Sequence, residues 1–178
     1  MAKGQVSLGL FNPKSPSNVG SVLRASGCYG VDRVFYSGTR FEYAAKYQTD
    51  TKNAKSKIPL KGVDCIVEGM RGANEQADQK PAIVCVELVE GATALPHFEH
   101  PENAYYLFGP EDGTLPQDVI DKADAVVYIP TIGCMNLAAT VNVLLYDRLA
   151  KSHQEIDDNA RIIASRDTNN RTRFERDN

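Results

Sequence analysis

Residues able to bind a ligand or take part in a reaction are concentrated in three short segments of this 178-residue chain. The first segment holds Asn12, Asn18, Gly20 and Arg24, the second reads FGPEDG (108–113), and the third reads IPTIGCMN (129–136). Amides, carboxylates and a guanidinium supply hydrogen bonds and charge. Glycine allows a backbone to approach a ligand closely. The three segments are therefore candidates for one functional site.

Each segment also has a simpler explanation when it is taken alone. Gly109 and Gly113 can serve tight turns. Glu111 and Asp112 can be solvated, and Arg24 can lie on the outer surface of a helix. Two phosphate-binding patterns are excluded, because no G-x-G-x-x-G follows the first strand and the sequence contains no G-K-[ST].

The elements that must position these segments alternate along the chain. Alternating or continuous apolar runs predict strands at 5–11, 31–36, 82–88, 104–108 and 125–129. Helices are expected from an N-cap at Ser17 or Asn18 to Gly27 or Gly30, within 69–79, at 116–123, and from about Asn136 onward. Residues 37–63 are expected to form an irregular excursion or a short helix. The last predicted helix carries an apolar stripe of Leu137, Val141, Leu144, Leu145 and Leu149.

Alternating strands and helices predict an α/β fold whose mostly parallel sheet is covered by helices on both faces. In such sheets ligands bind at loops beyond the carboxyl ends of the strands, which is where the three segments fall. We expect one domain over 1–151. Residues 152–178 lack apolar periodicity and carry Arg171, Arg173 and Arg176, so we expect a polar, mobile tail.

Composition limits the class of protein. Hydrophobic residues make up 42% and charged residues 24% of the chain, as in an ordinary globular protein. There is no apolar run long enough to span a membrane and no secretory signal pattern, so we expect a cytoplasmic protein without membrane partners. The four cysteines form no C-x-x-C pair and the three histidines have no ligand spacing with them, so neither a metal site nor a disulfide framework is predicted.

Charge is distributed unevenly along the chain. Residues 1–61 hold 10 Lys and Arg against 3 Asp and Glu (+7), and residues 62–178 hold 10 against 20 (−10), which gives the net charge of −3. The basic part also contains aromatic residues, a combination suited to the phosphates and unstacked bases of a single-stranded RNA loop. The predicted RNA-binding residues are Arg40, Lys46, Lys52 and Lys55. The alternative is a solvated basic face whose aromatic residues belong to the core.

Taken together and in this order, the three segments resemble the motifs of a known family. They read N-x-G-x-x-x-R (18–24), F-G-P-E-x-G (108–113) and I-P-x-x-G-x-x-N-L (129–137). This triple resembles that of the SPOUT methyltransferases, and most closely the TrmH-like (SpoU) branch, over about residues 5–150. The resemblance implies an enzyme that methylates a ribose 2′-hydroxyl of structured RNA, with S-adenosylmethionine as cofactor and S-adenosylhomocysteine as product. It also implies a C-terminal deep trefoil knot and a homodimer whose active site is completed across the two copies. The short chain shows no obvious extra RNA-binding domain, which favours tRNA over rRNA and leaves rRNA open.

The resemblance also implies roles for individual residues. The cofactor would be held by Glu87, Leu88, Leu107, Phe108, Gly109, Glu111, Gly113, Ile129, Pro130, Gly133, Cys134, Met135 and Leu137. Arg24 would be the central catalytic residue, with Asn18 near it and Asn136 at the start of the last helix. Arginine stays protonated. We therefore expect Arg24 to act as a cation that lowers the pKa of the hydroxyl and holds a neighbouring phosphate, rather than as a general base.

The third motif departs from the family pattern, in which many members read S-L-N-V-S. Cys134 and Ala138 stand at the two serine positions, and neither offers the hydrogen bonds of serine. This departure leaves two alternatives open: an RNA-binding protein that keeps the fold without turnover, and an α/β ligand-binding domain with no role on RNA.

Overall fold

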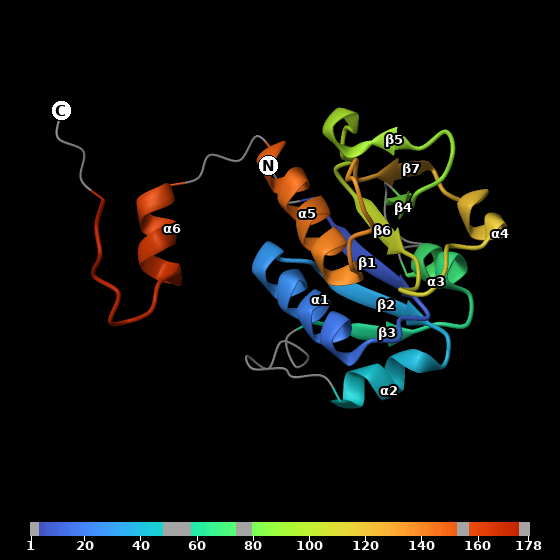
Figure 1. Ribbon diagram of the computed structural model, residues 1–178, viewed down its shortest axis with the longest axis horizontal. Helices are drawn as coiled ribbons and strands as arrows, with labels where there is room; N and C mark the ends of the chain where they lie inside the picture. The colour runs from blue at the N-terminus through green and yellow to red at the C-terminus, as the bar shows by residue number, and fades with distance from the viewer. Residues whose placement is uncertain (1–3, 48–57, 74–79, 153–156, 175–178) are drawn as a thin grey trace.

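The computed structural model describes residues 4–47, 58–73, 80–152 and 157–174. A seven-stranded sheet forms its centre (Figure 1), in the order β3-β2-β1-β6-β4-β7-β5, and every pairing between neighbouring strands is parallel. The strands are β1 (Val6–Phe11), β2 (Arg33–Ser37), β3 (Leu60–Gly62), β4 (Ala82–Val86), β5 (Thr93–Ala94), β6 (Ala104–Phe108) and β7 (Ala125–Tyr128).

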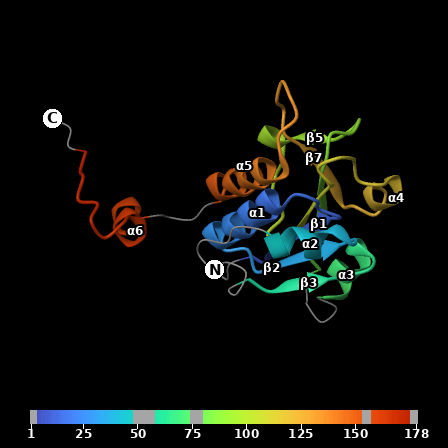
Figure 2. The same ribbon diagram turned by 60° about the horizontal axis from the view of Figure 1, so that its bottom comes forward.

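Helices cover both faces of the sheet, as the alternating pattern predicts (Figures 1 and 2). One face carries α1 (Pro16–Tyr29), α2 (Arg40–Tyr47) and α5 (Leu137–Ala150), and the other carries α3 (Ile66–Gly72) and α4 (Gln117–Ile120). Successive strand residues point to opposite faces. Thus Tyr106 and Phe108 of β6 join the first of two buried clusters, and Tyr105 and Leu107 join the second.

The end of α1 agrees with the sequence, and its start does not. Gly30 ends the helix in the left-handed conformation (φ 64°), which glycine adopts without steric cost. The predicted N-cap at Ser17 or Asn18 is wrong, because Ser15 caps the helix by accepting a hydrogen bond from the Asn18 N–H. Pro16 then occupies the first turn, where its missing N–H has no intrahelical partner to lose.

The last helix of the sheet domain, α5, is fixed near its C-terminal end by a polar network. His100 lies between Asp147 Oδ2 (2.9 Å) and the Tyr106 hydroxyl (2.7 Å), and Arg148 donates to that hydroxyl (2.9 Å) and to the Pro101 carbonyl (2.6 Å). Burial lowers the pKa of His100, which favours a neutral ring that donates to the carboxylate and accepts from the tyrosine. The network holds the helix whose N-terminus meets the third motif.

Two predictions for the rest of the chain need correction. The helix expected within 69–79 begins earlier, at Ile66, and ends at Gly72; residues 74–79 lie outside the described residues. The tail, for which no helix was predicted, contains α6 (Asp158–Ser165), which is capped by Asp157 and buries none of its residues (Figure 1). None of the described helices is long and apolar enough to cross a membrane.

Candidate cofactor pocket and active site

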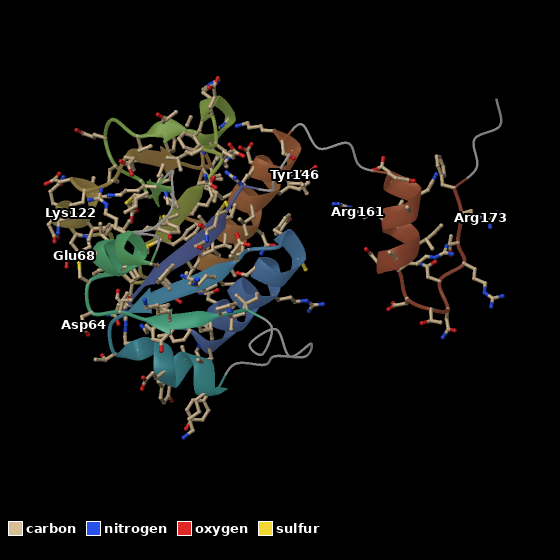
Figure 3. All side chains as sticks on the ribbon, turned by 180° about the vertical axis from the view of Figure 1, so that it is seen from behind. Asp64, Glu68, Lys122, Tyr146, Arg161 and Arg173 are labelled. Carbon is tan, nitrogen blue, oxygen red and sulfur yellow. The ribbon has the colours of Figure 1, made fainter. Side chains whose placement is uncertain are left out.

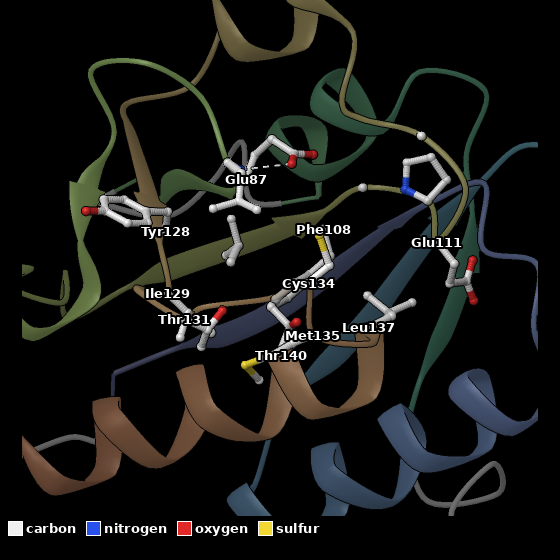
Figure 4. Close-up of a pocket in the computed structure, with 15 residues that line it drawn as sticks. Glu87, Phe108, Glu111, Tyr128, Ile129, Thr131, Cys134, Met135, Leu137 and Thr140 are labelled. Carbon is white, nitrogen blue, oxygen red and sulfur yellow. Dashed lines mark hydrogen bonds between the residues drawn. The ribbon is translucent and has the colours of Figure 1, made fainter.

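A cavity of about 200 Å³ opens at the carboxyl ends of β4, β6 and β7, where the second and third motifs meet (Figure 4). Ten of the thirteen predicted cofactor residues line it: Glu87, Leu88, Phe108, Gly109, Glu111, Gly113, Ile129, Cys134, Met135 and Leu137. The other three do not. Leu107 is fully buried in the opposite cluster, because it points to the other face of β6 from Phe108, and Pro130 and Gly133 lie off the cavity wall.

The cavity also has walls that the motif pattern did not indicate. Val86, Pro110, Tyr128, Thr131 and Thr140 line it as well. Two of them carried a usable signal. Tyr128 ends the strand that leads into the third motif, and Thr140 follows Leu137 by three residues, which places both on the same side of α5.

The wall of the cavity fits the chemistry of S-adenosylmethionine. Ile129, Met135 and Leu137 form an apolar surface of the kind that receives an adenine ring. The volume is below the roughly 300–1,000 Å³ of most small-molecule sites. The cavity would therefore enclose only part of an S-adenosylmethionine molecule.

Glu87 fixes the floor of the cavity below the second motif. Its two carboxylate oxygens accept the backbone N–H groups of Leu88 (2.9 Å) and Leu115 (3.0 Å), as Figure 4 shows in part. A Cβ added at Gly109 would lie 2.8 Å from Glu87 Oε2 and 3.4 Å from the Leu115 nitrogen. The carboxylate is held by two backbone groups and cannot swing away without losing one of them. Glycine is therefore required at position 109 for close packing.

Glu111 connects the cavity to the first motif. Its carboxylate accepts hydrogen bonds from the backbone N–H groups of Lys14 (2.8 Å) and Ser15 (3.0 Å) and from Asn18 Nδ2 (3.2 Å). Partial burial by itself would raise the pKa of Glu111, but these hydrogen bonds outweigh burial and lower it. The ionised carboxylate thus holds the N-terminus of α1 against the wall of the cavity, a link between segments more than 90 residues apart in sequence.

A second set of contacts joins the loop of the first segment and the loop of the second segment to α2. Arg40 donates from Nε (3.1 Å) and Nη2 (2.6 Å) to the Asn12 carbonyl and from Nη1 (2.8 Å) to Asp112. The Arg40 guanidinium, followed by Lys14, holds the pKa of Asp112 at about 2. Asn12 has a φ of 46° and packs against Gly38, whose φ of 81° favours glycine. We call Arg40, Asn12 and Asp112 the loop clamp.

Replacing Arg40 with methionine is expected to release the first loop from the second without emptying the cavity. We expect kcat for methyl transfer to fall about 10-fold, because small displacements of positioned groups cost up to about 100-fold, while cofactor affinity changes less than twofold. Steady-state kinetics and calorimetric titration with S-adenosylmethionine measure the two quantities. Lys122→Met, which removes one positive charge next to α4 (Figure 3), is the charge-matched control.

The pH dependence gives a second test of the loop clamp. Because the pKa of Asp112 is depressed, its ion pair with Arg40 is complete above the ordinary carboxyl value of 3.8 and is lost as the pH falls through about 2. The effect of Arg40→Met on kcat should therefore be constant between about pH 6 and pH 9. A ratio of wild-type to variant activity that changes severalfold across this interval would contradict the assignment.

The three predicted catalytic residues are placed differently. Asn18 lies next to the cavity through its bond to Glu111. Asn136 uses its side-chain oxygen to cap α5, accepting from the Ala139 N–H at 2.7 Å. Arg24 is exposed on α1, about 9 Å further along the helix axis than Asn18 at 1.5 Å per residue, and it does not line the cavity of its own chain.

The predicted RNA-binding residues also differ in where they lie. Arg40 is engaged in the loop clamp, and Lys46 is exposed on α2. Lys52 and Lys55 lie outside the described residues. RNA contact by all four stays a prediction.

Comparisons with known proteins agree with this geometry. A curated relative, the tRNA (cytidine-2′-O-)-methyltransferase TrmJ of Methanocaldococcus jannaschii, is 28% identical over 91% of this chain and 76% of its own length. The SpoU methyltransferase AviRb of Streptomyces viridochromogenes, solved with AdoMet, has a TM-score of 0.70 and 19% identity. It covers 84% of this chain, which spans 58% of AviRb. A structure solved for the 2-OH methylation of C/U34 on tRNA has a TM-score of 0.65 and 21% identity, and covers 83% of this chain and 96% of its own.

The structural neighbours show the fold, and the match to a family model shows the family. The model described as the SpoU rRNA Methylase family matches residues 5–146, from β1 into α5. The family, the cofactor S-adenosylmethionine and the enzyme class predicted from the three motifs are thereby confirmed. The chain belongs to the SpoU family of S-adenosylmethionine-dependent RNA methyltransferases.

Proposed function

We propose that the protein transfers a methyl group from S-adenosylmethionine to a ribose 2′-hydroxyl of tRNA. The observation that carries this proposal is the link through Glu111, which joins the cofactor cavity to Asn18 at the start of the motif that ends in Arg24. The choice of tRNA over rRNA rests on the curated relative, which acts on a tRNA cytidine.

Different residues have different roles in the proposed reaction. The bound cofactor supplies the methyl group of its sulfonium. Ile129, Met135 and Leu137 would bind the apolar part of the cofactor, and Gly109 lets the wall of the cavity pack closely against Glu87. Arg24 holds the phosphate beside the target ribose and favours the ionised form of the 2′-hydroxyl. Arginine does not release its own proton. The proton therefore goes to a phosphate oxygen or a water.

We propose a homodimer, because Arg24 does not reach the cavity of its own chain. Two further features support a contact between copies over α1 and α5. Two large hydrophobic side chains are exposed on α5: Tyr146 at 62% (labelled in Figure 3) and Val143 at 38%. On α1, which packs against α5, the exposed side carries the small residues Ser21 and Gly27 around Arg24. We also propose that the C-terminal part of the chain forms the deep trefoil knot that the family resemblance implies.

Methyl transfer to separated RNA fractions tests the proposed function. The protein is incubated with radiolabelled S-adenosylmethionine and either unmodified total tRNA or ribosomal RNA, and the product is digested with alkali. A 2′-O-methyl group blocks cleavage at the following phosphate, so labelled dinucleotides from tRNA support the proposal. Label in rRNA alone corrects the substrate. Label in alkali-labile mononucleotides would show that the acceptor is not the ribose hydroxyl. Cofactor binding without methyl transfer to either RNA would show that the protein is not an active methyltransferase on these RNAs.

A further inference from the structure

The outer side of α2 carries two exposed tyrosines that the core does not use. The inner side is firmly docked: Phe41 and Ala44 are buried, and the Phe41 ring stacks on Tyr36 with centroids 3.8 Å apart. On the outer side Tyr43 and Tyr47 are 65% and 58% exposed. Neighbouring apolar groups that are exposed together often mark an interaction site.

The two rings form a pair with a cation beside it. The centroids of Tyr43 and Tyr47 are 4.8 Å apart and the rings are tilted by 50°, and both side chains are more than half exposed. Lys46 Nζ lies 5.5 Å from the centre of the Tyr47 ring. A ring face beside an ammonium group offers stacking to a base and charge to the adjoining phosphate.

The N-terminal end of α2 is joined to a loop that borders the cofactor cavity. The helix begins at Arg40, which holds Asp112, the neighbour of the cavity residue Glu111. At 1.5 Å per residue, Tyr43 and Tyr47 lie about 5 and 10 Å along the axis from Arg40. Residues 1–61, which include α2, carry a net charge of +7.

We propose that Tyr43, Tyr47 and Lys46 form a stacking platform for an unpaired nucleobase of the substrate RNA, close to the methylated nucleotide. The proposal rests on the proposed function for the identity of the RNA. The exposed rings and the adjoining lysine favour a nucleic acid over a second copy of the chain, whose proposed contact lies on α1 and α5.

The chain contains no tryptophan, so a Tyr43→Trp protein has a single fluorescent reporter in the platform. We expect its emission to fall by about half or more when it is saturated with unmodified tRNA or with a ten-nucleotide oligouridylate, because bases stack on the indole. Glu68→Trp, at an exposed position on α3 across the sheet (Figure 3), is the matched control and should change little.

A second substitution in the reporter protein separates stacking from general packing. Tyr47→Leu should weaken tRNA binding about 10-fold and raise the KM for tRNA, with kcat nearly unchanged. Tyr47→Phe should change tRNA binding less than about twofold, because the ring and not the hydroxyl carries the interaction. Quenching without methyl transfer supports the platform and overturns the proposed function. Methyl transfer without quenching overturns the platform alone. A change of oligomeric state in Tyr47→Leu with unchanged RNA affinity also overturns it, in favour of a contact between copies.

Discussion

Replacing Gly109 with valine is expected to weaken S-adenosylmethionine binding by at least about 100-fold while the sheet stays folded. Even a single Cβ at this position would lie 2.8 Å from Glu87 Oε2, well inside normal contact distance. The carboxylate cannot yield freely, since it accepts the N–H groups of Leu88 and Leu115. The added methyl groups must then push the strand end or enter the cavity, and both remove space that the cofactor needs.

Calorimetric titration of wild type, Gly109→Ala and Gly109→Val measures this effect. We expect a graded loss, with the alanine protein weakened about 10-fold, because one Cβ displaces less than three carbons do. Thermal denaturation shows whether each protein is folded. Gly27→Ala on α1, where an added Cβ would meet only Ile58 at 3.9 Å, is the matched control. Micromolar binding by a folded Gly109→Val protein would place the cofactor elsewhere.

Most of the secondary structure could be predicted because its signals are local. The AYYLF run gave β6 with both of its ends, and Asn136 marked the start of α5, because strand alternation and an N-cap act over a few residues. The start of α1 was misplaced by two or three residues, although Pro16 was a cue for the first turn. The helix in the tail was missed because Ile162 and Ile163 are its only large apolar residues, too few to show a helical period.

The site was predictable only to the extent that the motif spacing carried it. The family resemblance correctly gave ten residues of the cavity. Leu107 was a wrong prediction, because strand alternation turns it away from the cavity side of its neighbour Phe108. The loop clamp had no signal at all. Arg40 and Asp112 are 72 residues apart, and nothing in either local sequence indicates that they meet. Arg40 was predicted to bind RNA because it lies in a basic segment with aromatic residues, and its bonds to Asn12 and Asp112 were not foreseen.

Substitution of Arg24 has the other large expected effect, and it falls on turnover rather than on binding. Arg24→Ala should lower kcat about 100- to 1,000-fold, the usual effect of removing one group that stabilises developing negative charge. Cofactor affinity should stay within about twofold, because Arg24 is exposed and lines no part of the cavity in its own chain. Arg24→Lys keeps the charge without the planar fork and should lose less. Undiminished turnover by Arg24→Lys would contradict a role that depends on the guanidinium.

Mixing two inactive proteins shows whether Arg24 serves the cavity of the other copy. Arg24→Ala keeps an intact cavity, and Gly109→Val keeps an intact Arg24. If the site is shared, a mixed dimer assembles one complete site from the cavity of the first protein and the arginine of the second. Random re-pairing at equal concentration makes half of the dimers mixed, so we expect about a quarter of wild-type activity to return. If each chain completes its own site, no mixed dimer holds both groups in one place, and the mixture stays inactive.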